Sequence, residues 1–210
     1  RSRGLGDVYK RQRQDATIMV AYLAQKERTD EALLAATAKA DQLLNEIERM
    51  VAMNCTAVDI AYTPADLYRL KREGKKAIML GIENGYAIGK DLTNVERFRK
   101  RGVVYMTLCH NGNNDICGSA RYNDEKIGVT PFGEQVIREM NRTGMMVDLS
   151  HAGEQTFYDT LEISSQPVVC SHSSCRALCD HPRNLTDDQL KAIARKGGVV
   201  QAVSYTHLRA

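Results

Sequence analysis

The apolar positions of this chain alternate between the spacing of amphipathic helices and short continuous runs that are typical of buried strands. Residues 17–23 form the first such run and predict a strand. Thr29 then caps a long predicted helix that extends to about Met53. The apolar side of this helix is expected to comprise Leu33, Ala36, Leu43, Leu44, Ile47 and Met50. Residues 57–62 are ambiguous between helix and strand.

A unit of capped helix, glycine and apolar strand then occurs four times. Thr63 to Asp66 has the pattern of a capping box, with proline at the first helical position. The four helices are expected to begin at Thr63, Thr93, Thr130 and Thr186 and to end at Gly74, Gly102, Gly144 and Gly197. The strands after these glycines are predicted at residues 77–82, 103–108, 145–149 and 199–203. Helices that end in glycine and lead into apolar strands are typical of a parallel α/β fold.

Two apolar runs in residues 144–174 each end in a Ser-His pair, and about one helix of amphipathic sequence separates them. The pairs are Ser150-His151 and Ser171-His172. Because ligands of parallel α/β folds bind at the carboxyl ends of the strands, both imidazoles are expected to point into the same space. Imidazole is the commonest metal ligand among side chains, so this segment predicts half of a metal site.

With the second of these runs, residues 168–170, the pattern gives about six strands. A (β/α)8 barrel from which strands are absent and a doubly wound sheet both agree with this order. No glycine-rich phosphate-binding pattern follows any strand, which argues against a nucleotide-binding sheet.

The composition is that of an ordinary globular chain, with 43% hydrophobic and 26% charged residues. The net charge of +3 arises in residues 1–13, whose five Lys and Arg and one Asp contribute +4 and leave −1 for the remainder. Charge therefore gives no support for binding to nucleic acid or to a membrane surface. No apolar run is long enough to span a bilayer and no signal-peptide core is present, so the cytoplasm is only the default expectation for the location.

Both ends of the chain depart from the helical and strand periodicities. Residues 1–14 are expected to be foreign to the fold or disordered, residues 15–203 to form part of a barrel, and residues 204–210 to be a foreign tail. His207 lies in this tail and is not expected to bind metal. We therefore expect the chain to be a fragment.

The cysteines are expected to be reduced thiols, because a chain of this size can fold on its hydrophobic core without disulfides. They are Cys55, Cys109, Cys117, Cys170, Cys175 and Cys179. The less favoured alternative is a structural zinc or iron–sulfur cluster, for which no Cys-x-x-Cys pair is present. Its ligands would be Cys170, His172, Cys175, Cys179 and His181.

Metal-binding or titratable side chains stand at the carboxyl ends of four successive predicted strands. They are Glu83, His110, His151 and His172. Each one alone would more often be a structural histidine or a solvated acid. Four in succession are difficult to explain in that way, because the rest of the chain contains only two histidines, His181 and His207.

Two neutral imidazoles and one carboxylate form the ligand set of a catalytic zinc ion with an open position for water. The two oxygens of Glu83 can also bridge two metal ions about 3.5–4 Å apart, as in two-metal hydrolases. His110 lies in a long polar loop, residues 109–130, that is able to close over a substrate. It can therefore contact the substrate instead of the metal.

Arg183 is the best candidate for binding an anion, because its planar guanidinium suits a carboxylate. From the local sequence alone, a surface arginine paired with Asp180 or Asp187 is the favoured interpretation. Asp148 is either a hydrogen-bond partner of a metal ligand or an acid at the edge of the core.

Over about residues 15–201 the sequence resembles the membrane dipeptidase (renal dipeptidase) family of zinc hydrolases, in its bacterial branch. Four long motifs carry the resemblance: GIENG, LCHNGNND, TPFGEQVIREMNRTGMMVDLSH and PVVCSHSSCRALCDHPRNLTDDQL. It implies an incomplete (β/α)8 barrel of the TIM type, with about strands 2 to 7 present. It also implies two zinc ions per intact active site and hydrolysis of dipeptides by metal-activated water.

The resemblance assigns a role to each candidate residue. Glu83 matches the bridging glutamate, and His151 and His172 match the two histidines of the second zinc ion. His110 matches the histidine that contacts the substrate and stabilises the tetrahedral intermediate, and Arg183 matches an arginine that holds the substrate.

Two elements of the family have no counterpart in the sequence. The His-x-Asp of the first strand is absent, since residues 1–17 contain no histidine, and the aspartate of the last strand would lie beyond Ala210. We therefore expect one three-ligand site, unpaired edges on the strands at residues 17–23 and 199–203, and little or no activity from this fragment. A homodimer is left open for the full-length protein.

Other classes remain as alternatives. Another metal-dependent amidohydrolase, or a non-catalytic metal-binding barrel, would use the same ligands. A barrel lyase or aldolase would need a Schiff-base lysine at a strand end, whereas Lys75 and Lys76 lie at a strand start.

Overall fold

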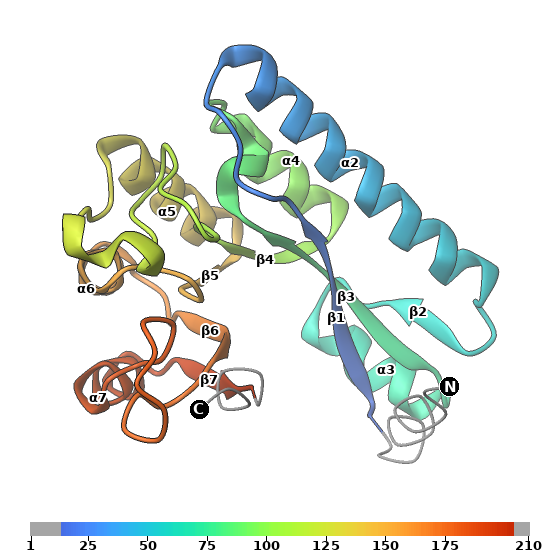
Figure 1. The fold of residues 1–210 in the computed structure, drawn as a ribbon. Coiled ribbons are helices and arrows are strands. Elements are labelled where there is room, and N and C mark those ends of the chain that lie inside the picture. Colours follow the sequence, from blue (N-terminus) through green and yellow to red (C-terminus); the bar gives the residue numbers. More distant parts are fainter. Residues whose placement is uncertain (1–13, 204–210) are drawn as a thin grey trace, which may run out of the picture.

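The computed structural model describes residues 14–203, which form a curved parallel sheet with helices packed against it (Figure 1). Residues 1–13 and 204–210, and with them His207, lie outside the described residues. The strands are β1 (Ala16–Tyr22), β2 (Val58–Ile60), β3 (Lys76–Glu83), β4 (Val103–Thr107), β5 (Met146–Asp148), β6 (Val169–Ser173) and β7 (Val199–Ala202). The helices are α2 (Asp30–Met53), α3 (Pro64–Arg72), α4 (Thr93–Arg101), α5 (Pro131–Thr143), α6 (Glu154–Ile163) and α7 (Asp187–Arg195), with the 3-10 helices η1 (Gly85–Ile88) and η2 (Ala120–Glu125).

The strands are all parallel and follow the order β1-β3-β4-β5-β6-β7. β1 runs along one side of β3, so β2 and β4 divide the other side of β3 between them. β2 pairs with the residues at the start of β3, from Lys76 to Ile78, and β4 pairs with those from Leu80 onward. The sheet curls into half of a barrel (Figure 1), which confirms the predicted incomplete TIM-type architecture and rules out the doubly wound alternative.

The register of the sheet places four polar side chains in one row at the carboxyl ends of neighbouring strands. Tyr22 of β1 is paired with Glu83 of β3, and Glu83 with Thr107 of β4. Thr107 is in turn paired with Asp148 of β5. Partners in a parallel register face the same side of the sheet, so this row marks the end of the half-barrel at which a site can form.

Most of the predicted helix signals act as expected. The side chains of Thr29, Thr63, Thr130 and Thr186 each accept a backbone N–H at the start of a helix. The glycines that follow the helices, Gly74, Gly102, Gly144 and Gly197, all have the positive φ that glycine adopts at low cost. The capping boxes at Thr63 and Thr186 are complete.

Two local predictions need correction, and one ambiguous segment is resolved. Thr93 does not cap α4, because its hydroxyl donates to Asp91 Oδ1 at 2.7 Å and the helix begins after Leu92. Met50 is 42% exposed, and Val51 is the buried residue at the end of the apolar side of α2. The ambiguous residues 57–62 contain the short strand β2, which the pairing with β3 stabilises.

The core lies between the sheet and the helices that cover it. Its largest fully buried side chains include Leu44, Leu80, Ile82, Phe98, Met106 and Ile137. None of the helices in residues 14–203 has the length and apolar character needed to cross a membrane. The apolar faces of these helices pack against the sheet.

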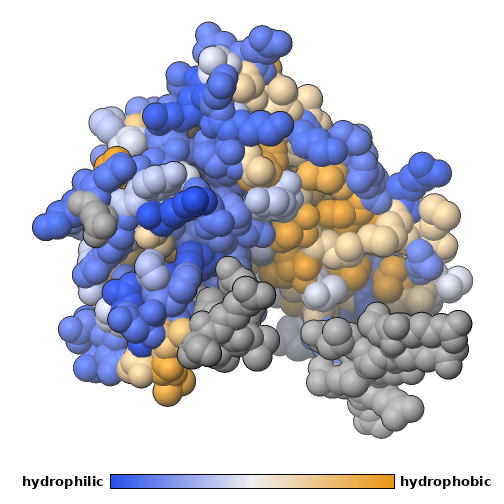
Figure 2. All heavy atoms as spheres, viewed as in Figure 1, coloured by the Kyte–Doolittle hydropathy of each residue, from blue (hydrophilic) through white to orange (hydrophobic). Residues whose placement is uncertain are grey.

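β1 and β7 lie at the two ends of the strand order of the described sheet, as predicted, and each pairs with a single strand. A groove of about 610 Å³ lies beside β1 and is lined by residues that include Leu23, Ala32 and Ala36. Figure 2 shows apolar side chains gathered in this region, between α2 and β1. An edge strand with one unpaired side and an adjoining apolar surface favours association with another chain, so we expect this side to promote aggregation.

Leu44 and Leu34 provide a test of the core on a single helix. Leu44 of α2 is fully buried, whereas Leu34 of the same helix is 74% exposed. We expect Leu44→Ala to lower the free energy of unfolding by about 2–5 kcal/mol, because it removes buried methyl groups and leaves a cavity. Leu34→Ala should change it by no more than about 0.5 kcal/mol. Denaturant titration followed by circular dichroism measures both, and similar losses in the two variants would contradict the described packing of α2.

Candidate metal centre

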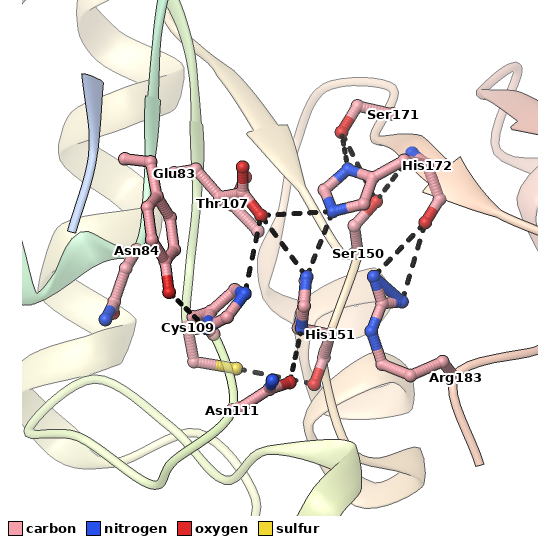
Figure 3. Close-up of polar contacts among 12 residues, drawn as sticks. Glu83, Asn84, Thr107, Cys109, Asn111, Ser150, His151, Ser171, His172 and Arg183 are labelled. Atoms are coloured by element: carbon pink, nitrogen blue, oxygen red, sulfur yellow. Dashed lines mark hydrogen bonds and ion pairs between the residues drawn. The ribbon is translucent and has the colours of Figure 1, made fainter. Parts of the chain in front are cut away.

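Three candidate ligands converge at the carboxyl ends of the strands (Figure 3). Glu83 is the last residue of β3, His151 follows β5 by three residues, and His172 lies within β6. Their ligand atoms all lie within 4.8 Å of one another. Within residues 14–203 this is the only group of three or more His, Cys, Asp or Glu side chains that could hold a metal ion.

The three ligand atoms are in direct contact. Glu83 Oε1 is 3.3 Å from His151 Nε2 and 3.2 Å from His172 Nε2. The two Nε2 atoms are 3.0 Å apart. In Figure 3 the carboxylate of Glu83 faces both rings, and the side chain of His151 is only 7% exposed.

Irregular backbone brings these side chains together. His151 has a φ of 70°, in the left-handed region that a non-glycine residue seldom adopts. The pairing of β6 with β7 shifts between Cys170 and Ser173, which interrupts the regular alternation of side chains around His172. Such features cost energy and persist where surrounding contacts fix them, as commonly happens at functional sites.

The far sides of the rings determine which nitrogen faces the centre. His151 Nδ1 is 3.0 Å from Asn111 Oδ1, an oxygen that can only accept, so the ring proton resides on Nδ1. His172 Nδ1 is 2.7 Å from the hydroxyl of Ser171. With the protons on the Nδ1 atoms, both Nε2 atoms direct lone pairs toward the Glu83 carboxylate. Three acceptors this close repel one another, and a cation between them removes the repulsion.

The pKa values describe the same group when protons, and not a metal ion, lie between the three side chains. Burial raises the pKa of Glu83, but the hydrogen bonds and charges of His151 and His172 outweigh it and hold this pKa well below the ordinary range. Burial lowers the pKa of His151 to about 4. At neutral pH the site therefore contains an ionised carboxylate and a neutral His151 imidazole, the protonation states in which these groups bind metals.

His110 lies beside the three-residue group. Its Nε2 is 3.7 Å from Glu83 Oε1, and its ring centroid is 4.1 Å from that of His151. The hydroxyl of Tyr22 approaches its Nδ1 at 3.4 Å. Burial lowers the pKa of His110, so this ring is also neutral at neutral pH.

Arg183 lies on the other side of His172. Its guanidinium donates to the backbone carbonyl of His172, with Nη2 at 3.3 Å and Nη1 at 3.5 Å (Figure 3). The residue is only 9% exposed, so Arg183 does not point freely into solvent. A positive charge therefore lies next to the candidate metal centre.

The alternatives from the sequence find less support. All six cysteines are free thiols, as expected, and His172 contacts Glu83 and His151 instead of joining a cysteine cluster. Cys170 is buried, and burial raises the pKa of its thiol, which disfavours the thiolate that metal binding needs. Lys76 begins β3, at the opposite end of that strand from Glu83, so it is not placed for Schiff-base chemistry at this site.

The sequence did not identify three residues that contact these histidines. Tyr22 and Asn111 bond to His110 and His151, and Ser171 bonds to His172. Ser171 belongs to a repeated Ser-His pair, a signal that was available in the sequence. Asn111 directly follows His110 but contacts a ring from a different strand end, and no local pattern indicates such a contact.

The fold and this group of side chains together define the class of the protein. It is an α/β half-barrel with a candidate metal centre made of one carboxylate and two imidazoles at the carboxyl ends of the strands.

Comparison with known proteins specifies the family. Residues 8–208 match the family model described as membrane dipeptidase, peptidase family M19, and the chain belongs to this family, as its motifs indicated. It is 35% identical over 161 residues to "Dipeptidase tcpJ" of Claviceps purpurea and 38% identical over 136 residues to "Dipeptidase 3" of Mus musculus. The crystal structure of "the probable dipeptidase PvdM" from Pseudomonas aeruginosa superimposes with a TM-score of 0.85 at 29% identity, covering 93% of this chain.

The chain spans only part of these relatives. The match with the Claviceps protein covers 76% of this chain and 38% of that protein, and the match with the mouse protein covers 62% and 28%. This chain covers 52% of the Pseudomonas chain.

The lowered pKa of His151 predicts how stability depends on pH. Between pH 6.5 and about 4 the unfolded chain binds a proton at this histidine that the folded chain does not bind. The free energy of unfolding of the metal-free protein should therefore fall as the pH drops through this window, by an amount on the order of 1–3 kcal/mol. Denaturant titrations in the presence of a chelator measure the fall. His151→Gln should reduce it, and an equally steep fall in that variant would exclude His151 as its source.

Proposed function

We propose that this chain is part of a zinc-dependent dipeptidase in which Glu83, His151 and His172 hold a zinc ion. The observation that carries the proposal is the convergence of one carboxylate oxygen and two Nε2 atoms at 3.0–3.3 Å, with hydrogen-bond partners, Asn111 and Ser171, at the Nδ1 atoms of the two rings. The family supports the choice of a peptide bond as the target, since the matched relatives carry the name dipeptidase.

The donor set fits zinc. Imidazole nitrogens and a carboxylate oxygen are ligands that zinc prefers, and three protein ligands leave a position open. When bound, zinc lowers the pKa of a coordinated water molecule to about 7 and polarises a carbonyl group. Glu83 Oε1 faces the two imidazoles, which leaves its second oxygen for a second ion, in agreement with the bridging role that the family resemblance implies.

The neighbouring residues would act on the substrate. The neutral ring of His110 can donate a proton to a hydrogen bond with the carbonyl oxygen that gains charge as the peptide bond is attacked. Arg183 supplies a positive charge near His172 that would attract a charged end of a dipeptide, and so favours short substrates.

A metal-binding half-barrel without turnover is the second candidate for the 210 residues by themselves. The three ligands lie on β3 and β6 and directly after β5, all of which have neighbours on both sides. The exposed edges of β1 and β7, by contrast, leave the barrel unclosed, so a substrate would be held from one side only. We therefore expect these residues to bind zinc without appreciable hydrolysis, and the longer proteins that contain them to be active.

Glu83→Gln tests the metal centre in a protein that carries this sequence within a complete barrel. The amide has the same shape but lacks the negative charge, so zinc binding should weaken and dipeptide hydrolysis should fall by more than about 100-fold. Loss of a residue that only hydrogen-bonds to a metal ligand already lowers metal affinity or activity by about 10–100-fold, so loss of a ligand charge should cost more. Zinc content by atomic emission and hydrolysis of a panel of dipeptides measure the two effects. Retention of full zinc content and activity would refute the role of Glu83.

His110→Ala distinguishes two possible roles of His110, contact with the substrate and binding of the metal. We expect kcat to fall by about 10²–10³-fold, the typical effect of losing one donor to the developing negative charge, with zinc content unchanged. Steady-state kinetics and metal analysis of the same preparation measure both. Loss of zinc along with activity would show that His110 binds the metal.

A further inference from the structure

Ser171 lies between the carboxylate of Asp148 and the ring of His172. Its Oγ is 2.6 Å from Asp148 Oδ2 and 2.7 Å from His172 Nδ1. Figure 3 shows the hydroxyl of Ser171 directed at the His172 ring. Asp148 is completely buried, so this single hydroxyl connects a buried acid to a candidate metal ligand.

This contact depends on the irregularity of β6. Adjacent residues of a regular strand point to opposite faces of the sheet, which would separate Ser171 from the ring of His172. The pairing of β6 with β7 shifts between Cys170 and Ser173, and both side chains then approach the same place. The interruption of the strand thus creates the hydrogen bond.

The hydrogen bonds of Asp148 determine the direction of the contact. Its Oδ1 accepts the backbone N–H groups of Ser150 and Ser171, at 3.0 and 2.9 Å. Its Oδ2 accepts the hydroxyls of Thr107 and Ser171, both at 2.6 Å. The only hydroxyl proton of Ser171 is therefore given to Asp148, and its oxygen can only accept from His172 Nδ1–H. In the neutral ring, this direction places a lone pair on His172 Nε2, on the side of Glu83.

The two histidines are held by different chemistry. The ring of His151 donates to the neutral amide oxygen of Asn111, whereas the ring of His172 donates to a hydroxyl that a carboxylate polarises. A chain of two hydrogen bonds that ends on an anion strengthens both bonds. It also increases the basicity of the opposite nitrogen, as carboxylates behind metal-binding histidines do.

We propose that Ser171, backed by Asp148, is a positioning residue that fixes the Nδ1–H tautomer of His172 and so presents Nε2 to the metal. The proposal rests on the metal site proposed above, although the tautomer itself does not require a metal. Ser150 provides a matched control. Its hydroxyl accepts the backbone N–H of His172 at 3.0 Å and lies 3.3 Å from Ser171 Oγ, but it does not bond to the ring.

The test compares Ser171→Ala, Ser171→Thr and Ser150→Ala. Long-range ¹H–¹⁵N spectra of the metal-free 210-residue chain, with the His172 signal assigned from His172→Gln, report the tautomer. Competition with a chromophoric chelator reports zinc affinity. We expect Ser171→Ala to lose the pure Nδ1–H form and to bind zinc about 10–100-fold more weakly. Ser171→Thr retains the hydroxyl and should restore both properties, and Ser150→Ala should retain the tautomer.

The outcomes separate this proposal from the proposed function. A Ser171→Ala protein that keeps the Nδ1–H tautomer and the original zinc affinity would overturn the positioning role. A similar loss of the tautomer in Ser150→Ala would also overturn it, since a general disturbance of β6 would then explain the result. If the unmodified chain binds no zinc but only Ser171→Ala changes the tautomer, the metal site fails and the positioning of the ring stands.

Discussion

The parallel register of the sheet is the constraint on which the site depends. Hydrogen bonds between neighbouring strands place Tyr22, Glu83, Thr107 and Asp148 in a single row at the carboxyl ends of the strands. A slip of one residue in any of these pairings would turn the side chains of a strand to the other face of the sheet. Glu83 would then leave the histidines, and Asp148 would lose its contact with Thr107. The burial of the apolar side chains that alternate with this row keeps the register in place.

Charge is distributed unevenly over this row. Glu83 Oε1 faces the Nε2 atoms of two imidazoles, so a cation can bind between these three atoms. Asp148, two strands away, is satisfied by four donors and needs no cation of its own. The two acids therefore have different tasks. Glu83 is available to bind a cation, and Asp148 orients its neighbours by accepting hydrogen bonds from hydroxyl and backbone N–H groups.

The candidate metal centre lies on the middle strands of the half-barrel, away from its two edge strands. The strands that carry or precede the three ligands are paired on both sides, and the edge strands β1 and β7 contribute none of the three. Metal binding and hydrolysis thus place different demands on the fold. The convergence of the ligands needs only the strands that are paired on both sides, whereas a substrate held from all sides needs a closed barrel. This difference agrees with a chain that covers about half of its structural relatives.

The sequence by itself determined the features that depend on near neighbours. These features are the caps at Thr63 and Thr186, the glycines that end the helices, and the Ser-His pairs. They depend on hydrogen bonds or backbone preferences within a few residues, so the local sequence was enough to predict them. Only the tertiary structure decided which strand lies beside which and which ring meets which partner. The contact of Asn111 with His151 spans 40 positions, and that of Tyr22 with His110 spans 88. Such contacts arise when strands far apart in the chain pair in one register, and no local pattern encodes that register.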